Sequence, residues 1–186
     1  FLPRGKRLKF IPDDEKLQDK LITVKYDQDF LPVEGMKVLC RIQKYGTAIV
    51  VYVERVFGYK DDPGVDILAI LLDHDIDPQF PEAVMEEIKT IPQEIQESDK
   101  KDRVDLTSET IVTIDGDDSK DFDDAVGVTP VENGWVLKVS IADVSHYVTE
   151  DSALDQEALA RGCSTYVTDR VVPMLPHELS NGICSL

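Results

Sequence analysis

The sequence contains few cysteines, one tryptophan and no long hydrophobic run. Its three cysteines, Cys40, Cys163 and Cys184, are too few and too scattered for a disulfide framework or a zinc site. The longest apolar runs, residues 48–53 and 67–72, are far shorter than the roughly 18 to 20 residues that cross a bilayer. We therefore expect a protein with no membrane partner, in the reducing setting of the cytoplasm.

Positive charge is also scarce, and it is unevenly distributed. The chain has 186 residues, with 20 Lys and Arg against 37 Asp and Glu, for a net charge of −17. Residues 1–60 hold 12 basic and 8 acidic residues (+4), so residues 61–186 hold 8 and 29 (−21). A basic first part favours contact with a polyanion such as nucleic acid, although +4 is also compatible with an ordinary surface.

The first part of the chain has the pattern of a small β protein. Residues 8–57 contain short segments rich in β-branched and aromatic residues, separated by turn signals. This pattern predicts a small barrel of the OB or cold-shock type over residues 1–57, and an SH3-like barrel would give nearly the same pattern. Residues 58–105 are predicted to be a linking segment with one helix, which begins near Pro81 and ends at Pro92.

Residues 106–186 mix strand and helix signals and predict an α+β module. We expect a strand over 110–114 and an antiparallel hairpin in which residues 125–131 and 135–144 flank the Asn133-Gly134 turn. Ser152 opens a capping box and Gly162 ends the helix that follows. Residues 166–175 are predicted to be extended.

Acidic residues are concentrated between positions 115 and 124. Two unit charges about 4 Å apart repel by roughly 4 kcal/mol at an effective dielectric near 20, so a cluster held between apolar strands needs a cation. An EF-hand is excluded, because Lys120 and Val126 stand where its glycine and its glutamate are required. Phosphoester chemistry with Mg²⁺ and a solvated acidic loop both remain open. The six carboxylates are Asp115, Asp117, Asp118, Asp121, Asp123 and Asp124.

Three ordered blocks of the second module resemble the RNB catalytic domain of the RNase II superfamily. The first is residues 113–125, the second is residues 141–148 with 152–155 and 161–162, and the third is Tyr166 with residues 172–176, 179–182 and 184–186. The resemblance implies a cold-shock-like β barrel followed by an α+β catalytic domain of RNB type. Because the match stops at Leu186, we expect that domain to be incomplete and inactive by itself.

The family is a Mg²⁺-dependent, processive 3′-to-5′ exoribonuclease that hydrolyses single-stranded RNA to 5′-mononucleotides as a monomer. The resemblance implies that one or two Mg²⁺ ions bind to four catalytic and metal-binding aspartates, Asp115, Asp121, Asp123 and Asp124. Asp115 and Asp124 are the expected direct ligands. The alternatives are a non-catalytic RNA-binding or regulatory module on an RNB scaffold and a structural Ca²⁺-binding domain.

Further residues are expected to contact RNA. The resemblance places Tyr166 against the 3′-terminal nucleotide, where a phenol offers a stacking face and a hydroxyl. Arg170 could meet phosphate or form a structural ion pair. Asp143 and His146 are expected to be structural, and Trp135 is expected in the core. Basic residues of the first part could bind phosphates, and we select Lys6, Arg7, Lys9 and Lys44.

Overall fold

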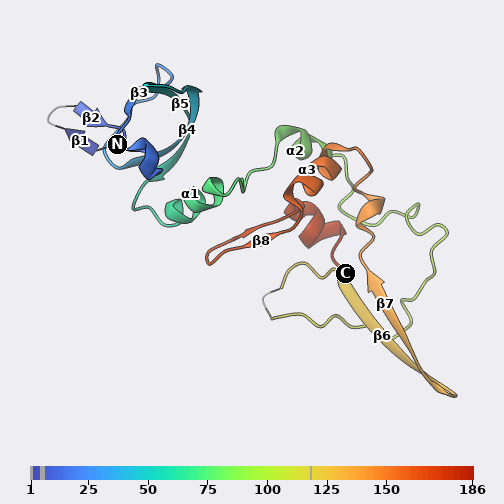
Figure 1. The fold of residues 1–186 in the computed structure, drawn as a ribbon. Coiled ribbons are helices and arrows are strands. Elements are labelled where there is room, and N and C mark those ends of the chain that lie inside the picture. The colour runs from blue at the N-terminus through green and yellow to red at the C-terminus, as the bar shows by residue number, and fades with distance from the viewer. Residues whose placement is uncertain (1, 5–6, 118) are drawn as a thin grey trace. The chain divides into compact units, whose positions relative to one another are not determined.

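The computed structural model describes residues 2–4, 7–117 and 119–186 (Figure 1). The chain separates into two compact units, Phe1–Ile76 and Asp77–Leu186. The domain boundary predicted from the sequence, after residue 57, stays a prediction. Within the first unit, helix α1 (Val65–Asp73) contacts strand β5 (Ala48–Tyr59).

The first unit is built on one three-stranded sheet and a short hairpin. In the sheet the order is β3-β5-β4; β3 runs parallel to β5 and β4 runs antiparallel to it. Alternate residues of β5, Ile49, Val51 and Val53, are buried, as expected for a strand with one face in the core. The other elements are hairpin strands β1 (Leu2–Arg4) and β2 (Arg7–Lys9), the 3₁₀ turn Glu15–Leu17, β3 (Leu21–Lys25) and β4 (Met36–Lys44).

The prediction of a closed barrel is not confirmed. Within the described residues, β3 and β4 each pair with β5, whereas β1 and β2 pair with each other. The sheet therefore keeps two open edges, because no described strand joins β3 to β4. The strand-rich character predicted for this part of the chain is confirmed.

The segment between strand β5 and residue 105 contains two helices rather than the predicted one. Helix α1 begins after Gly64, whose φ of 78° is the left-handed conformation that favours glycine, and it buries Val65 and Leu71. Helix α2 (Glu82–Ile88) begins directly after Pro81 and buries Val84 and Ile88, as its apolar spacing predicts. The apolar run at residues 67–72 was short enough to suit either a strand or a helix, so periodicity alone did not identify α1.

The second unit packs helices α2 and α3 (Ala153–Arg161) around a small core. Its buried residues come from three parts of the chain, and the cluster is Val84, Ile88, Leu154, Leu179 and Cys184. The predicted caps of α3 are confirmed: the Ser152 hydroxyl accepts the N–H of Asp155 at 3.1 Å, and Gly162 ends the helix with φ of 72°. The remaining elements are the 3₁₀ turn Val144–His146, strands β8 (Thr165–Tyr166) and β9 (Val171–Val172), and the helical segment Leu179–Ile183.

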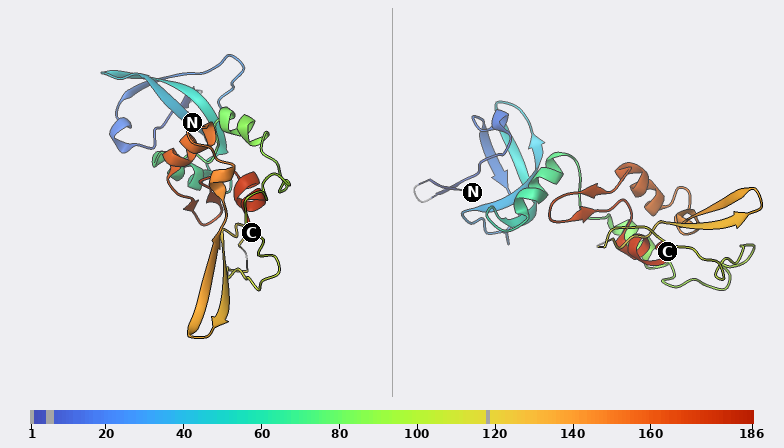
Figure 2. Two further views of the ribbon diagram at one scale, coloured as in Figure 1. Left: turned by 90° about the vertical axis from the view of Figure 1, so that its right-hand side faces the viewer. Right: turned by 90° about the horizontal axis from the view of Figure 1, so that it is seen from below.

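A long hairpin projects from the helical part of the second unit (Figures 1 and 2). Strands β6 (Asp124–Val131) and β7 (Gly134–Ile141) pair antiparallel across the predicted turn. Trp135 is 72% exposed near its tip, so the prediction that it lies in the core is wrong. The expected strand over 110–114 is reduced to one bridge between Val112 and Val126. Across the described part of the chain, no helix has the length and apolarity of a membrane span.

Candidate functional site

The acidic motif lies on a loop that leads into strand β6. The base of this loop is closed by two hydrogen bonds between Val112 and Val126, of 3.0 and 2.8 Å. Gly127, the next residue of β6, is buried where a Cβ atom would lie 3.1 Å from the Thr110 carbonyl oxygen. The absence of a side chain at Gly127 therefore lets the incoming segment approach β6 closely.

The end of the acidic loop is attached to two other parts of the unit. The Phe122 N–H donates to Ser185 Oγ at 3.1 Å, and the Leu186 N–H donates to the Phe122 carbonyl at 2.8 Å. The Ala142 N–H donates to the Asp123 carbonyl at 2.9 Å. These bonds fix the backbone that presents the last three aspartates of the motif.

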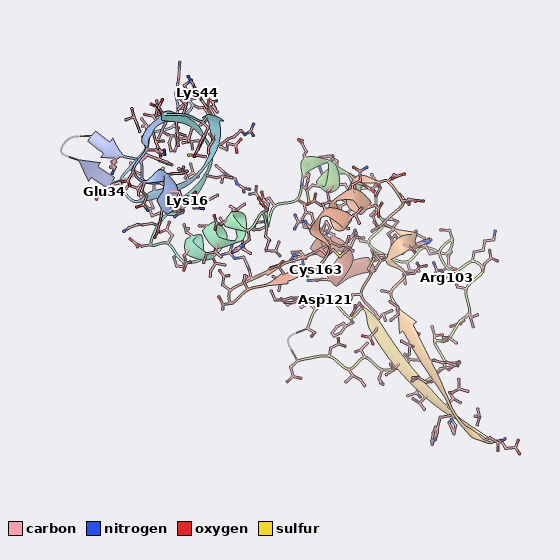
Figure 3. All side chains as sticks on the ribbon, in the orientation of Figure 1. Lys16, Glu34, Lys44, Arg103, Asp121 and Cys163 are labelled. Carbon is pink, nitrogen blue, oxygen red and sulfur yellow. The ribbon has the colours of Figure 1, made fainter. Side chains whose placement is uncertain are left out.

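The four predicted catalytic aspartates are all exposed. Asp115 lies near the start of the loop, Asp121 and Asp123 flank Phe122, and Asp124 is the first residue of β6, opposite Ile141 (Asp121 is labelled in Figure 3). No described Lys or Arg side chain forms an ion pair with any of the four. Oxygen donors with uncompensated negative charge fit a hard divalent cation such as Mg²⁺.

The structure does not gather these carboxylates around one point. Within residues 2–4, 7–117 and 119–186, no group of three or more His, Cys, Asp or Glu side chains is placed to hold a metal ion. Asp121, Asp123 and Asp124 lie at the end of the loop that is held by hydrogen bonds, whereas Asp115 lies near the start of the loop. Their convergence on a metal ion therefore stays a prediction.

A network of ion pairs and hydrogen bonds joins residues 99–103 to the segment that follows β7. Arg103 Nη2 lies 2.5 Å from Asp143 Oδ2 and its Nε donates to the Asp99 carbonyl at 2.7 Å, and His146 Nε2 lies 3.1 Å from Asp99 Oδ1 (Arg103 is labelled in Figure 3). The hydrogen bond from Arg103 and a second from Ser145 lower the pKa of Asp143 below its usual value. The Gln96 N–H and His146 lower the pKa of Asp99. The structural roles expected for Asp143 and His146 thus have identified partners.

The predicted RNA-binding residues of the second unit share one small hairpin. Tyr166 ends β8, is 70% exposed and pairs with Val171 of β9. Arg170 lies in the connecting turn, where its carbonyl accepts the Val167 N–H at 3.0 Å and its side chain forms an ion pair with Asp169 at 2.7 Å. A free tyrosine ring and a cation that already has a carboxylate partner therefore lie close together in the chain.

The predicted basic residues of the first unit fall on two separate sheets. Lys9 is exposed at the end of β2, and Lys44 is exposed at the end of β4 (labelled in Figure 3). Arg7 lies in β2, and Lys6 lies outside the described residues. Lys9 and Lys44 therefore lie at the ends of strands in different sheets.

Sequence reasoning missed the residues that support the acidic loop. Ser185, Ala142 and Arg103 lie 63, 19 and 40 positions from Phe122, Asp123 and Asp143, their partners. None of them has a local pattern that points to its partner. The available signal was that Ala142 and Ser185 belong to blocks that resemble the family.

Comparisons with known proteins agree with the two-unit organisation. Residues 103–186 match the RNB domain, and residues 10–81 match the Cold shock domain. The chain is 46% identical over 188 residues to the ribonuclease R of Thermotoga maritima, an alignment that covers 95% of this chain and 26% of the relative. The chain thus spans about a quarter of the length of this relative.

Two solved structures show the same fold. Mycoplasma genitalium RNase R in complex with ribose-methylated single-stranded RNA matches with a TM-score of 0.77 and 36% identity, over 90% of this chain and 27% of that one. Yeast Ssd1, described as a pseudonuclease, matches with a TM-score of 0.62 and 18% identity, over 92% of this chain and 23% of that one. The second likeness shows the fold alone, so the fold does not decide whether the chain is catalytic.

Proposed function

The chain belongs to the RNB family, with a cold-shock domain ahead of the RNB segment, and from this premise we propose that it is part of a Mg²⁺-dependent exoribonuclease. The proposed reaction is processive hydrolysis of single-stranded RNA from its 3′ end to 5′-mononucleotides. The likeness to ribonuclease R extends along 95% of the chain, which includes both units.

The observation that carries the proposal is that the acidic loop presents four exposed carboxylates, unpaired within the described residues, three of them on an anchored backbone. Asp115, Asp121, Asp123 and Asp124 are exposed, they form no ion pair with a described Lys or Arg, and the last three lie on backbone held by the Phe122 and Asp123 hydrogen bonds. A stabilising role in folding would be expected to pair or disperse these charges. Retaining them on an anchored backbone favours a role that needs negative charge, such as holding a cation.

The four carboxylates divide into two roles in this proposal. Asp115 and Asp124 would bind Mg²⁺ directly, and Asp121 and Asp123 would bind a second ion or orient the attacking water. When bound, Mg²⁺ would activate water and neutralise charge on the phosphoryl oxygens. The chain's own contribution is to hold carboxylate oxygens beside the scissile phosphate and to accept hydrogen bonds from the water.

The hairpin of β8 and β9 is proposed to hold the 3′ end of the RNA. The exposed Tyr166 ring can stack on a base, and base–aromatic stacking is worth about 1–3 kcal/mol per base. Arg170 would have to leave Asp169 to meet a phosphate, so its ion pair makes it the weaker of the two contacts. In the first unit, Lys9 and Lys44 are exposed and can contribute to phosphate binding that does not depend on sequence.

The competing function is a non-catalytic RNA-binding or regulatory module on the same scaffold. A chimera separates the two: this chain replaces the aligned segment of the Thermotoga maritima ribonuclease R, and the unmodified enzyme is the control. The chimera is incubated with 5′-labelled single-stranded RNA and Mg²⁺. We expect mononucleotide release that EDTA abolishes. RNA binding without products in a folded chimera would favour the non-catalytic module.

A further inference from the structure

The backbone of Phe122 is held on both sides by two consecutive residues from the other end of the unit. Its N–H donates to the Ser185 hydroxyl at 3.1 Å, and its carbonyl accepts the Leu186 N–H at 2.8 Å. Phe122 is the residue between Asp121 and Asp123. The two peptide planes that carry these carboxylates are therefore those that Ser185 and Leu186 orient.

Ser185 is itself held in a fixed place by the core. Its N–H donates to the Gly182 carbonyl at 2.9 Å, and the preceding Cys184 N–H donates to the Leu179 carbonyl at 3.0 Å. Leu179 is completely buried and Cys184 is 6% exposed, and both belong to the cluster that contains Leu154 of α3. The core therefore fixes the position of Ser185, and the Ser185 hydroxyl in turn holds the Phe122 N–H of the acidic loop.

The rest of the loop has little support of this kind. Within the described residues 113–117 and 119–121, the backbone hydrogen bond present joins the Ser119 N–H to the Gly116 carbonyl, inside the loop itself. Phe122 and Ser185 are both partly buried, so an N–H that lost its acceptor there would be poorly compensated by water. The Phe122–Ser185 bond is therefore a point at which a small change should move the aspartates.

We infer that Ser185 is a positioning residue: its hydroxyl holds the Phe122 N–H and so sets the placement of the Asp121 and Asp123 carboxylates for a divalent ion. The inference rests on the proposed function. Mg²⁺ and ions like it accept carboxylate oxygens within a narrow range of distance and angle. Displacements of about 1 Å at an active site can cost on the order of a hundredfold in rate, so an anchor one residue away is functionally relevant.

Mn²⁺ binding to the 186-residue chain, followed by electron paramagnetic resonance of the free ion, tests this role. Ser185→Ala is expected to weaken Mn²⁺ binding about tenfold, because the loop end loses its side-chain acceptor. Ser185→Thr keeps a hydroxyl and is expected to retain most of the affinity. Ser180→Ala is the matched control, because that partly buried hydroxyl lies in the same C-terminal segment and donates to Asn181 Oδ1 at 3.1 Å.

Amide hydrogen exchange measures the anchoring directly and checks folding in the same samples. In Ser185→Ala the Phe122 amide is expected to exchange faster, while the Val126 amide, which donates to Val112 at 2.8 Å, keeps its protection. Unchanged Mn²⁺ affinity together with lost Phe122 protection would overturn the inference, and so would a Ser185→Thr chain as weak as Ser185→Ala. An unchanged Phe122 amide in Ser185→Ala would equally contradict it.

Mn²⁺ binding distinguishes failure of the proposed metal site from failure of the positioning role of Ser185. If the unsubstituted chain bound no Mn²⁺, the proposed metal site would be refuted, and the role of Ser185 in metal positioning would fall with it. If the unsubstituted chain bound Mn²⁺ and the Asp124→Asn chain did not, while Ser185→Ala bound normally, the proposed site would stand and the positioning role alone would be refuted.

Discussion

The carbonyl of Asp123 accepts a 2.9 Å hydrogen bond from the N–H of Ala142. This bond joins the acidic loop to the end of β7, where Asp143 follows directly and forms its ion pair with Arg103. The loop therefore has two supports, one from residues 185 and 186 and one from the segment after β7. Both supports connect positions that are far apart in the sequence.

The stability that the Arg103–Asp143 ion pair contributes is expected to depend on pH. Hydrogen bonds from Arg103 and Ser145 lower the pKa of Asp143, and electrostatic attraction to Arg103 and His146 lowers it further. A carboxylate with a depressed folded pKa adds stability above its unfolded pKa, near 3.9, and loses it as the pH falls through the lower folded value. The thermal midpoint of the chain should thus exceed that of Asp143→Asn by a constant amount between pH 7 and 5.

The difference should then shrink below about pH 4, where the carboxylate begins to be protonated. It should be small at every pH, because both side chains are nearly half exposed. Thermal unfolding of the two chains followed by circular dichroism at pH 3 to 7 measures it. A difference that grows as the pH falls would contradict the assigned sign.

Gly127→Ala should destabilise the second unit. Its Cβ would lie 3.1 Å from the Thr110 carbonyl oxygen and 3.2 Å from Ile111 Cγ1, so the segment before the loop would have to move. We expect a loss of about 1–3 kcal/mol in the free energy of unfolding, as for other overpacked sites. Urea denaturation measures it. Gly46→Ala is the control, since its nearest contact is 3.9 Å; equal losses in the two variants would refute the steric explanation.

Tyr166→Ala should change the products of RNA degradation more than the initial rate. If the exposed ring stacks on the last base, its loss removes about 1–3 kcal/mol, which matters most when few bases remain bound. In the chimera with Thermotoga maritima ribonuclease R, the shortest end products should become longer. Tyr166→Phe keeps the ring and should give the normal ladder. A normal ladder from Tyr166→Ala would exclude the stacking role.

Local features of the fold could be predicted from the sequence because their causes are local. The Ser152 cap, the end of α3 at Gly162 and the turn before Trp135 each depend on residues within a few positions of one another. The exposure of Trp135 could not be predicted in this way. It depends on what packs against the β6–β7 hairpin, and the aromatic residue type alone favoured burial.

The same distinction between local and long-range causes applies to the candidate site. Its acidic motif could be read from the sequence because the aspartates are neighbours in the chain. Its supports could not, since the Phe122–Ser185 bond spans 63 positions and the Arg103–Asp143 pair spans 40. Closure of the first sheet into a barrel was also a long-range question, and strand patterns do not determine which edges meet.

The central claim is that the acidic loop is the hydrolytic site, and substitution of Asp124 tests it most directly. In the chimera, Asp124→Asn removes one charge at the start of β6 and keeps the shape of the side chain. Its control is Asp117→Asn, which removes a charge from the same loop outside the predicted ligand set. The measurement is the initial rate of Mg²⁺-dependent mononucleotide release, with RNA affinity measured in parallel. We predict that Asp124→Asn lowers the rate by orders of magnitude with little change in RNA affinity, while Asp117→Asn stays near normal. Near-normal release from Asp124→Asn would contradict the account.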